Sequence, residues 1–257
     1  MMRKARLGAL AGALGLLGMA PAFATPLATP SYTFNKSTVI AGARLFADHC
    51  SACHAVSNLR YDRLESLGMT KAEIKKDIML PGGANILKGM RPTMTQADAK
   101  KWFGLPPPNL SHIVRAMGAR WVYTYLTSFY WDPKRPSGWN NHVFPNVAMP
   151  NILAPWGGTY TKTGKVLQPG RETPAAYHKE VAEIVAFLRY ASDPSVFERR
   201  ELGRYVLGVM VLLTVLAYLL KKEYWKDVHG PEKPGEEGHS QDVGASKKRR
   251  EGRSGTR

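Results

Sequence analysis

The chain begins with a short basic segment, residues 1–6, followed by an uninterrupted apolar run, Leu7–Ala20. Ala22-Phe23-Ala24 comes next and places small residues at alternate positions, the pattern of a signal-peptidase site. An uncleaved anchor is the alternative, but the apolar run is short and a cleavage site follows it at once. We therefore predict a secretory signal peptide over residues 1–24, which exports the rest of the chain.

A second apolar run, Tyr205–Leu220, has sixteen residues and no charge. As a helix it would measure about 24 Å, slightly less than the hydrocarbon core of a bilayer. Arg204 before it and Lys221 and Lys222 after it can extend toward the headgroups. A buried core helix is the alternative for so short a run, but this one is apolar on every face and precedes a polar tail. We predict one transmembrane anchor over residues 203–222.

Between the two runs, apolar residues recur with helical spacing in four stretches. Each stretch begins at a residue type that caps helices, and Thr70 with Glu73 forms a capping box. The segment Trp131–Trp156 is rich in Pro, Asn, Gly and Trp and is predicted to be loop, so the fold is mainly α with long loops. The predicted helices are Ser37–His49, Thr70–Leu80, Ser111–Phe129 and the helix opened by Thr173 and Pro174, which carries an apolar stripe of Val181, Ile184, Val185 and Leu188.

The order of the two apolar runs predicts the layout of the chain. Residues 25–202 form the exported domain, and residues 223–257 form a cytoplasmic tail. The tail has almost no apolar residues from Asp227 onward and is expected to be disordered. Its basic cluster, Lys247–Arg250, is typical of nucleic-acid binding, but no binding fold accompanies it. We predict a solvated end that approaches anionic lipid and does not bind nucleic acid.

Only two cysteines are present, in the sequence Cys50-Ser51-Ala52-Cys53-His54. A disulfide oxidoreductase motif would belong near a βαβ pattern, which this region lacks, and a zinc site would need two more ligands at matching spacing. C-x-x-C-H is the attachment sequence for haem c. We therefore predict one covalent haem c, with Cys50 and Cys53 bound to its vinyl groups and His54 bound to its iron.

A sixth iron ligand must come from elsewhere in the chain. Met149 lies in an irregular segment, Asn146–Pro150, where a neighbouring proline can hold it against the distal side of the iron. His142 is the main alternative, and an imidazole there would give a lower potential than a thioether. Spacing alone leaves both residues open.

Three further segments resemble the cytochrome c1 family. The segment Leu105–Arg115 is similar to that family's Pro-Pro-Asp-Leu-Ser stretch, with Asn109 in place of the usual Asp. Val147–Pro150 resembles its axial-methionine segment, and Thr173–Pro194 resembles the helix before its single C-terminal anchor. The order of these features matches from about residue 32 to residue 226, and Trp131–Pro145 is most similar to the compact proteobacterial versions.

The resemblance implies a class I cytochrome c-like haem domain in which Met149 is the sixth ligand. It implies the redox subunit of the respiratory cytochrome bc1 complex, the ubiquinol–cytochrome c oxidoreductase, which is not an enzyme on its own. Its partners would be cytochrome b, the Rieske iron–sulfur protein as electron donor and a c-type cytochrome as acceptor, in a dimeric complex. The haem domain would lie in the periplasm, held by one helix in the bacterial inner membrane.

The surroundings of the haem propionates depart from the family pattern. Many members have Arg-x-Arg after the Pro-rich stretch, whereas this chain has Arg115-Ala116-Met117. Arg120, about one helical turn further on, can replace the missing arginine or remain a solvated cation. Trp121 falls where an aromatic propionate neighbour is expected, and the resemblance also places Pro108 beside the haem.

Other functions share some of these features. Another membrane-anchored monohaem c-type cytochrome, such as an oxidase subunit or a free carrier, would have the same signal, haem motif and anchor. A haem enzyme such as a peroxidase would need an open sixth position. The other anchored cytochrome would not share the Pro-rich segment or the Thr173-Pro174-Ala175 segment.

The net charge of the exported part is unusual for the family. Residues 25–202 contain 22 Lys and Arg against 13 Asp and Glu, so this part is formally +9. Cytochrome c1 proteins usually offer acidic patches to a basic cytochrome c. A basic domain suggests an acidic or membrane-tethered acceptor, because complementary fields steer association.

Overall fold

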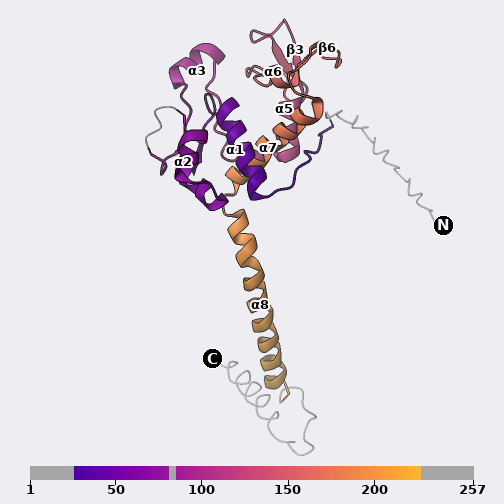
Figure 1. Cartoon of the computed structure of the whole chain (residues 1–257). Helices are drawn as coiled ribbons and strands as arrows, with labels where there is room; N and C mark the ends of the chain where they lie inside the picture. The colour runs from indigo at the N-terminus through magenta and orange to yellow at the C-terminus, as the bar shows by residue number, and fades with distance from the viewer. Residues whose placement is uncertain (1–25, 81–84, 227–257) are drawn as a thin grey trace, which may run out of the picture. The chain divides into compact units, whose positions relative to one another are not determined.

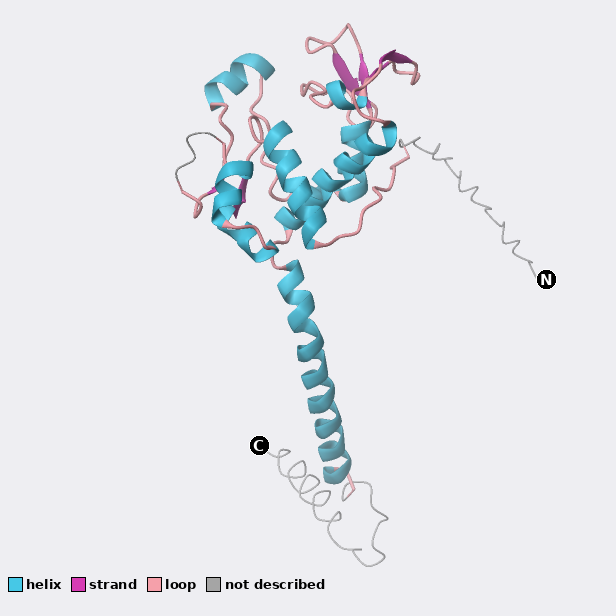
Figure 2. Ribbon diagram, viewed as in Figure 1, coloured by secondary structure: helices cyan, strands magenta, loops and turns pink. Residues whose placement is uncertain are grey.

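The computed structural model describes residues 26–80 and 85–226, so the predicted signal peptide and most of the predicted tail lie outside the described residues. The described chain is mainly helical, with three two-stranded antiparallel sheets (Figures 1 and 2). It forms two compact units that divide after Val196. In chain order the elements are α1 (Lys36–His49), β1 (Val56–Arg60), η1 (Tyr61–Leu67), α2 (Lys71–Glu73), η2 (Ile74–Ile78), β2 (Gly89–Met90), α3 (Gln96–Phe103), α4 (Ile113–Met117), α5 (Ala119–Thr127), β3 (Phe129–Trp131), β4 (Trp139–Asn141), α6 (Ala154–Gly157), β5 (Thr159–Tyr160), β6 (Val166–Gln168), α7 (Pro174–Ser192) and α8 (Val196–Tyr224).

The core of the first unit lies where α1 packs against α7 (Figure 1). Phe46 of α1 and Phe187 of α7 are fully buried, and their ring centroids are 5.1 Å apart. A methyl group on Gly42 would lie 1.9 Å from the carbonyl oxygen of Glu183, so only glycine allows this approach of the two backbones. The predicted stripe on α7 is buried, which confirms that the helix is a core element.

The caps of these two helices show one wrong prediction and one confirmed prediction. Asn35 caps α1, because its side-chain oxygen accepts a hydrogen bond from the amide of Thr38 at 2.8 Å. Ser37, the predicted cap, lies within the helix and donates its hydroxyl to the same oxygen of Asn35. Thr173 caps α7 and Pro174 occupies the first helical position, as predicted.

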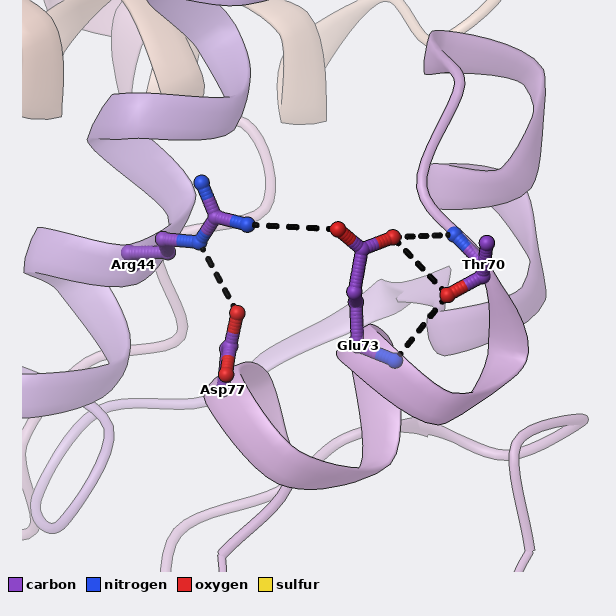
Figure 3. Close-up of polar contacts among 4 residues, drawn as sticks. All are labelled: Arg44, Thr70, Glu73 and Asp77. Carbon is purple, nitrogen blue, oxygen red and sulfur yellow. Dashed lines mark hydrogen bonds and ion pairs between the residues drawn. The ribbon is translucent and has the colours of Figure 1, made fainter.

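The predicted capping box forms between Thr70 and Glu73 (Figure 3). The Glu73 carboxylate accepts from the Thr70 amide at 2.8 Å, and this bond is the main cause of the lowered pKa of Glu73. Arg44 of α1 reaches both Glu73 and Asp77, with nitrogen–oxygen distances of 3.8 and 3.1 Å. These ion pairs connect α2 and η2 to α1. The continuous helix made of α2 and η2 ends at Ile78 instead of the predicted Leu80.

The predicted helix Ser111–Phe129 is broken into α4 and α5 at Gly118. This glycine has φ 86°, a left-handed backbone that an L side chain rarely adopts. Ser111 does not cap the helix as predicted, because His112 is the N-cap residue. The Ser111 hydroxyl instead donates to the side chain of Asn109 at 2.7 Å and accepts from the Asn58 amide at 3.0 Å.

The segment predicted to be loop contains short regular elements. Strands β3 and β4 form a hairpin in which Trp131 is opposite Trp139, and α6 follows over Ala154–Gly157. The remainder of the segment, including the stretch around Met149, has no regular secondary structure. Long loops therefore build this part of the unit, with more local order than the composition predicted.

The second unit contains α8, which begins before the predicted anchor at residue 203 and ends beyond residue 222. Its apolar side chains between Leu202 and Leu220 are exposed. Within residues 26–80 and 85–226, α8 is the helix that is long and apolar enough to cross a membrane. This is what a membrane anchor requires.

Candidate haem-binding site

The C-x-x-C-H motif directly follows α1. The amide of Cys50 donates to the carbonyl of Phe46 at 2.9 Å, which completes the last helical turn. The amides of Cys53 and His54 then both bond to the carbonyl of Cys50, at 3.1 and 2.9 Å. This tight turn places both sulfur atoms and the imidazole on the wall of one cavity. Burial raises the pKa of the Cys50 thiol to about 12, with a smaller contribution from Cys53.

The His54 ring is held by the Pro-rich loop. Its Nδ1 atom lies 2.9 Å from the carbonyl oxygen of Pro108, so Nδ1 carries the proton and Nε2 is left to bind a metal. The amide of Leu110 donates to the carbonyl of Ala55 at 2.8 Å, which fixes the loop beside the motif. Burial lowers the pKa of His54, and the bond to Pro108 opposes this shift in part. Burial thus favours the neutral imidazole, while the bond to Pro108 orients its ring.

Asn109, the departure from the family's Asp, organises the start of this loop. Its side-chain oxygen accepts from the amide and the hydroxyl of Ser111, at 3.0 and 2.7 Å. Its amide nitrogen donates to the Ser57 hydroxyl at 2.5 Å. An aspartate can accept from Ser111 but cannot donate to Ser57, so the amide serves both neighbours.

The motif opens onto an apolar cavity of about 400 Å³. Ligand pockets in proteins occupy roughly 300–1,000 Å³. The cavity is walled by the Cys-His turn, the Pro-rich loop, α5, α7 and the loop around Met149. Two thiols, an imidazole with a free Nε2, a thioether and apolar walls form a donor set that fits haem c.

Met149 lines this cavity and is half-buried. The hydroxyl of Tyr125, on α5, donates to its sulfur at 3.4 Å. His142, the alternative sixth ligand, is exposed and lines a separate cavity, where its ring packs on Tyr130 with centroids 4.7 Å apart. Of the two candidates, the structure brings only Met149 together with Cys50, Cys53 and His54.

The loop that carries Met149 is fastened by a polar cluster. Asn146 has φ 64°, and among the described residues it is the one non-glycine residue with positive φ. Arg135 donates to its side-chain oxygen at 3.2 Å and to its carbonyl oxygen at 3.0 Å. The backbone amide of Asn146 donates to the side-chain oxygen of Asn140 at 2.8 Å. The side-chain nitrogen of Asn140 in turn donates to the carboxylate of Asp132 at 3.0 Å. The β3–β4 hairpin therefore positions the Met149 loop.

Of the residues predicted to lie near the haem propionates, Trp121 lines the cavity, whereas Arg115 and Arg120 do not. Trp121 lines the cavity and stacks on Tyr125, with ring centroids 5.2 Å apart and planes 8° apart. Arg120 is exposed and donates to the carbonyl of Leu27. Arg115 and Met117 are exposed and do not line the cavity. A role in propionate binding stays a prediction for Arg115 and Arg120.

Sequence reasoning missed two features of the site. Tyr125 lies in the predicted helix Ser111–Phe129, and its contact with Met149 was not predicted, although a tyrosine on an otherwise apolar helix face is a signal that its hydroxyl has a polar partner. The Arg135–Asn146 clamp gave no signal, because both residues lie in a segment predicted to be loop.

The comparisons with known proteins agree on one family. The model of the Cytochrome C1 family matches residues 26–79 and 90–228. Cytochrome c1 of Allochromatium vinosum is 39% identical over 211 residues, covering 76% of this chain and 86% of the relative. The mitochondrial cytochrome c1 heme protein of Kluyveromyces lactis is 25% identical over 225 residues, covering 77% and 74%. A Nitrosomonas europaea protein named ammonia monooxygenase gamma subunit is 40% identical over 200 residues, covering 76% and 85%. The chain belongs to the cytochrome c1 family, the haem-bearing electron-transfer proteins that bind haem c covalently.

Proposed function

We propose that Cys50 and Cys53 form the two thioether bonds to haem c and that His54 and Met149 are the axial ligands of its iron. The observation that carries this assignment is that all four side chains line one apolar cavity. Bound haem c supplies a one-electron centre, so no acid, base or nucleophile is required of the protein. The protein is therefore the electron-transfer subunit of a cytochrome bc1 complex, not an enzyme on its own.

The residues around the cavity set the potential of this centre. Pro108 orients the His54 ring, and the clamp on Asn146 holds the Met149 loop. A thioether opposite an imidazole, in apolar surroundings, favours the reduced state and raises the potential. The apolar walls also keep water from the site, which limits reorganisation around the changing charge.

The partners follow from the family. Cytochrome b anchors the complex in the membrane, the Rieske iron–sulfur protein donates the electron and a c-type cytochrome accepts it. The complex is a dimer.

The layout along the chain supports a periplasmic site. Residues 1–24 act as a cleaved signal, residues 25–202 form the periplasmic domain, residues 203–222 cross the inner membrane and residues 223–257 lie in the cytoplasm. The support for this layout is the signal pattern before residue 25 and the exposed apolar surface of α8. Haem c is attached on the exported side of the membrane, which agrees with this direction.

A second candidate function is suggested by the Nitrosomonas europaea relative, whose name assigns it to an ammonia monooxygenase. In that case the chain would be a membrane-anchored monohaem cytochrome of another oxidoreductase. Purification of the tagged chain from native membranes separates the two functions. Co-purification of a cytochrome b and a Rieske protein is the expected result. Other partners with neither of these two would contradict the proposed function and favour the second.

A further inference from the structure

The excess positive charge of the first unit lies in one stretch of the chain. Residues 85–173 contain 11 Lys and Arg against 3 Asp and Glu. Residues 26–80 and 174–195 contain 9 against 8, so they are almost neutral. The charged stretch supplies the Pro-rich loop, α5 and the Met149 loop to the cavity wall. The excess charge therefore lies in the stretch that supplies part of the cavity wall.

Two exposed apolar side chains lie at the cavity and also face solvent. Leu105 is 71% exposed and Phe144 is 53% exposed, and both line the cavity. They come from the Pro-rich loop and from the loop before Met149, so they border the cavity on two segments. An exposed apolar centre bordered by charge is the usual composition of a transient protein interface.

Four exposed cations lie within three positions in sequence of a residue that lines the cavity, and we name them the cationic rim. Lys100 and Lys101 on α3 precede the lining residue Phe103, while Arg115 and Arg120 lie on α4 and α5, which supply Ile113 and Trp121. The residues of the cationic rim are Lys100, Lys101, Arg115 and Arg120.

The cationic rim is not neutralised from within. In residues 26–80 and 85–226, no carboxylate forms an ion pair with any of its four members. The acids Asp98 and Asp132 bond to neutral neighbours and to no member of the rim, because Asp98 accepts from the Thr95 hydroxyl at 2.6 Å and Asp132 accepts from Asn140. The rim therefore presents its charge to solvent.

We propose that the cationic rim and the apolar pair Leu105 and Phe144 form the docking surface for an acidic c-type cytochrome. This inference rests on the proposed function and specifies the acceptor by its charge. Opposite charges raise association rates by roughly 10- to 1,000-fold and make them fall steeply with salt. A basic acceptor would be repelled by the same surface.

The test uses the purified complex with two soluble c-type cytochromes, one acidic and one basic. The rate of electron transfer to each and its dissociation constant are measured over a range of salt. The double variant K100E/K101E reverses charge on the rim. The double variant K75E/K76E makes the same charge change in η2, whose lysines are exposed and do not line the cavity.

The wild-type complex is expected to react faster with the acidic cytochrome, and salt should slow that reaction. K100E/K101E should slow it about tenfold or more and speed the basic cytochrome, while K75E/K76E should change both much less. A wild type that prefers the basic cytochrome, or equal effects of the two variants, would overturn the proposal. A rim variant that slows only the quinol-driven reduction of its own haem would assign the surface to the Rieske protein instead. Failure of quinol to reduce the wild-type haem would contradict the proposed function itself.

An independent observation concerns Tyr125. Its hydroxyl donates to the sulfur of Met149 at 3.4 Å, while its ring is held between Trp121 and Phe129, with both centroid distances 5.2 Å. The hydroxyl is thus aimed at the sulfur by aromatic packing. A hydrogen bond to a ligand atom withdraws electron density from it, and second-shell bonds of this kind tune a metal centre.

We infer that Tyr125 is a positioning residue that raises the haem potential through the sulfur of Met149. Y125F removes the hydroxyl and keeps the aromatic ring. It should shift the ratio of reduced to oxidised haem at a fixed ambient potential by about two- to fivefold toward the oxidised form. The sulfur-to-iron charge-transfer band should shift as well, which a purely structural role would not cause.

Tyr123 offers the matched control. It lies on the same helix, and its hydroxyl is 3.0 Å from His178 rather than near Met149. Y123F should leave the potential and the charge-transfer band unchanged. An unchanged potential in Y125F, or an equal shift in Y123F, would overturn the inference.

Discussion

At the scale of single residues, the candidate site depends on the four side chains proposed to hold the haem and on the groups that orient them. Cys50, Cys53 and His54 are fixed by the hydrogen bonds of a turn at the end of a helix. Met149 lies on an irregular loop, so its position depends on contacts from other segments. The Cys-His turn is thus built locally, whereas the orientation of the His54 ring and the position of Met149 depend on tertiary contacts.

Replacing Met149 with Leu removes the thioether and keeps an apolar side chain of similar size. We expect the midpoint potential to fall by on the order of 0.1 V or more, because axial ligands set haem potentials over a range of about 0.8 V. The Rieske protein should then reduce the haem poorly. Potentiometric titration of the purified complex measures this. His142→Gln is the control. If the potential falls in that variant and does not fall in Met149→Leu, then His142 and not Met149 is the sixth ligand.

The left-handed backbone of Asn146 gives a second prediction. Asn146→Ala loses the bond from Arg135 and places a less tolerant residue at φ 64°, at a cost of about 1–3 kcal/mol. Asn146→Gly loses the same side chain but relieves the backbone. Thermal unfolding followed by haem absorbance should rank the wild type first, Gly second and Ala last. If the Ala variant unfolds at the same temperature as the Gly variant or at a higher one, tolerance of the left-handed backbone is not what Asn146 contributes to stability.

Much of the site could be predicted from single residues. The C-x-x-C-H spacing is specific, but spacing left both Met149 and His142 open. The resemblance to the cytochrome c1 family favoured Met149, and the residues that line the cavity support that choice. Tyr125 and Arg135 could not be predicted, since their roles arise from residues 24 and 11 positions away in the chain. Pattern reasoning detects spacing along one element but not contacts between segments.

At the scale of elements, the close contact of α1 with α7 places the haem motif. The C-terminal end of α1 delivers Cys50, and α7 supplies Ile184 and Leu188 to the same cavity. This contact is close because Gly42 has no side chain. The geometry of the cavity therefore depends on a position that takes no part in binding.

Replacing Gly42 with Ala should force the two helices apart. The added methyl group would meet the Glu183 carbonyl at 1.9 Å, and backbone atoms cannot yield as a flexible side chain can. We expect a loss of about 1–3 kcal/mol or more in the free energy of unfolding, measured by denaturation of the purified complex. Gly203→Ala is the matched control, because a methyl group there meets nothing within 4 Å. Equal stability of the two variants would contradict the account of the helix contact.

Elements were predicted best where both a cap and a stripe were present. The helix opened by Thr173 and Pro174 is such a case, and the capping box of Thr70 and Glu73 correctly marked a helix start. The break at Gly118 was missed because a single glycine inside a helical pattern is often tolerated. Strands of two or three residues, such as β2 and β5, are too short to show an alternating pattern.

At the scale of the whole molecule, the described residues combine the proposed redox domain with the long apolar helix α8. The apolar side chains of α8 between Leu202 and Leu220 are exposed on all sides of the helix. Exposure of such a surface is unfavourable in water and favourable in lipid. The signal pattern before residue 25 and the polar sequence after α8 support the proposed layout of an anchored periplasmic protein.

This layout predicts the effect of truncation. A chain that ends at Leu202 should carry its haem and appear in the soluble periplasmic fraction, with Thr25 as its first residue. The full-length chain should remain with the membranes until detergent is added. Fractionation, haem staining and N-terminal sequencing check these outcomes. A truncated chain that stays with the membranes would mean that the exported domain binds lipid or a membrane partner without α8.

The most direct test of the central claim is a difference spectrum of the purified membrane complex, reduced by quinol and oxidised by ferricyanide. We expect a c-type haem that remains bound to this chain after denaturation, is reduced by quinol and is unaffected by carbon monoxide, because both axial positions are filled. A chain without covalent haem, a haem that quinol does not reduce, or one that binds carbon monoxide would contradict the account.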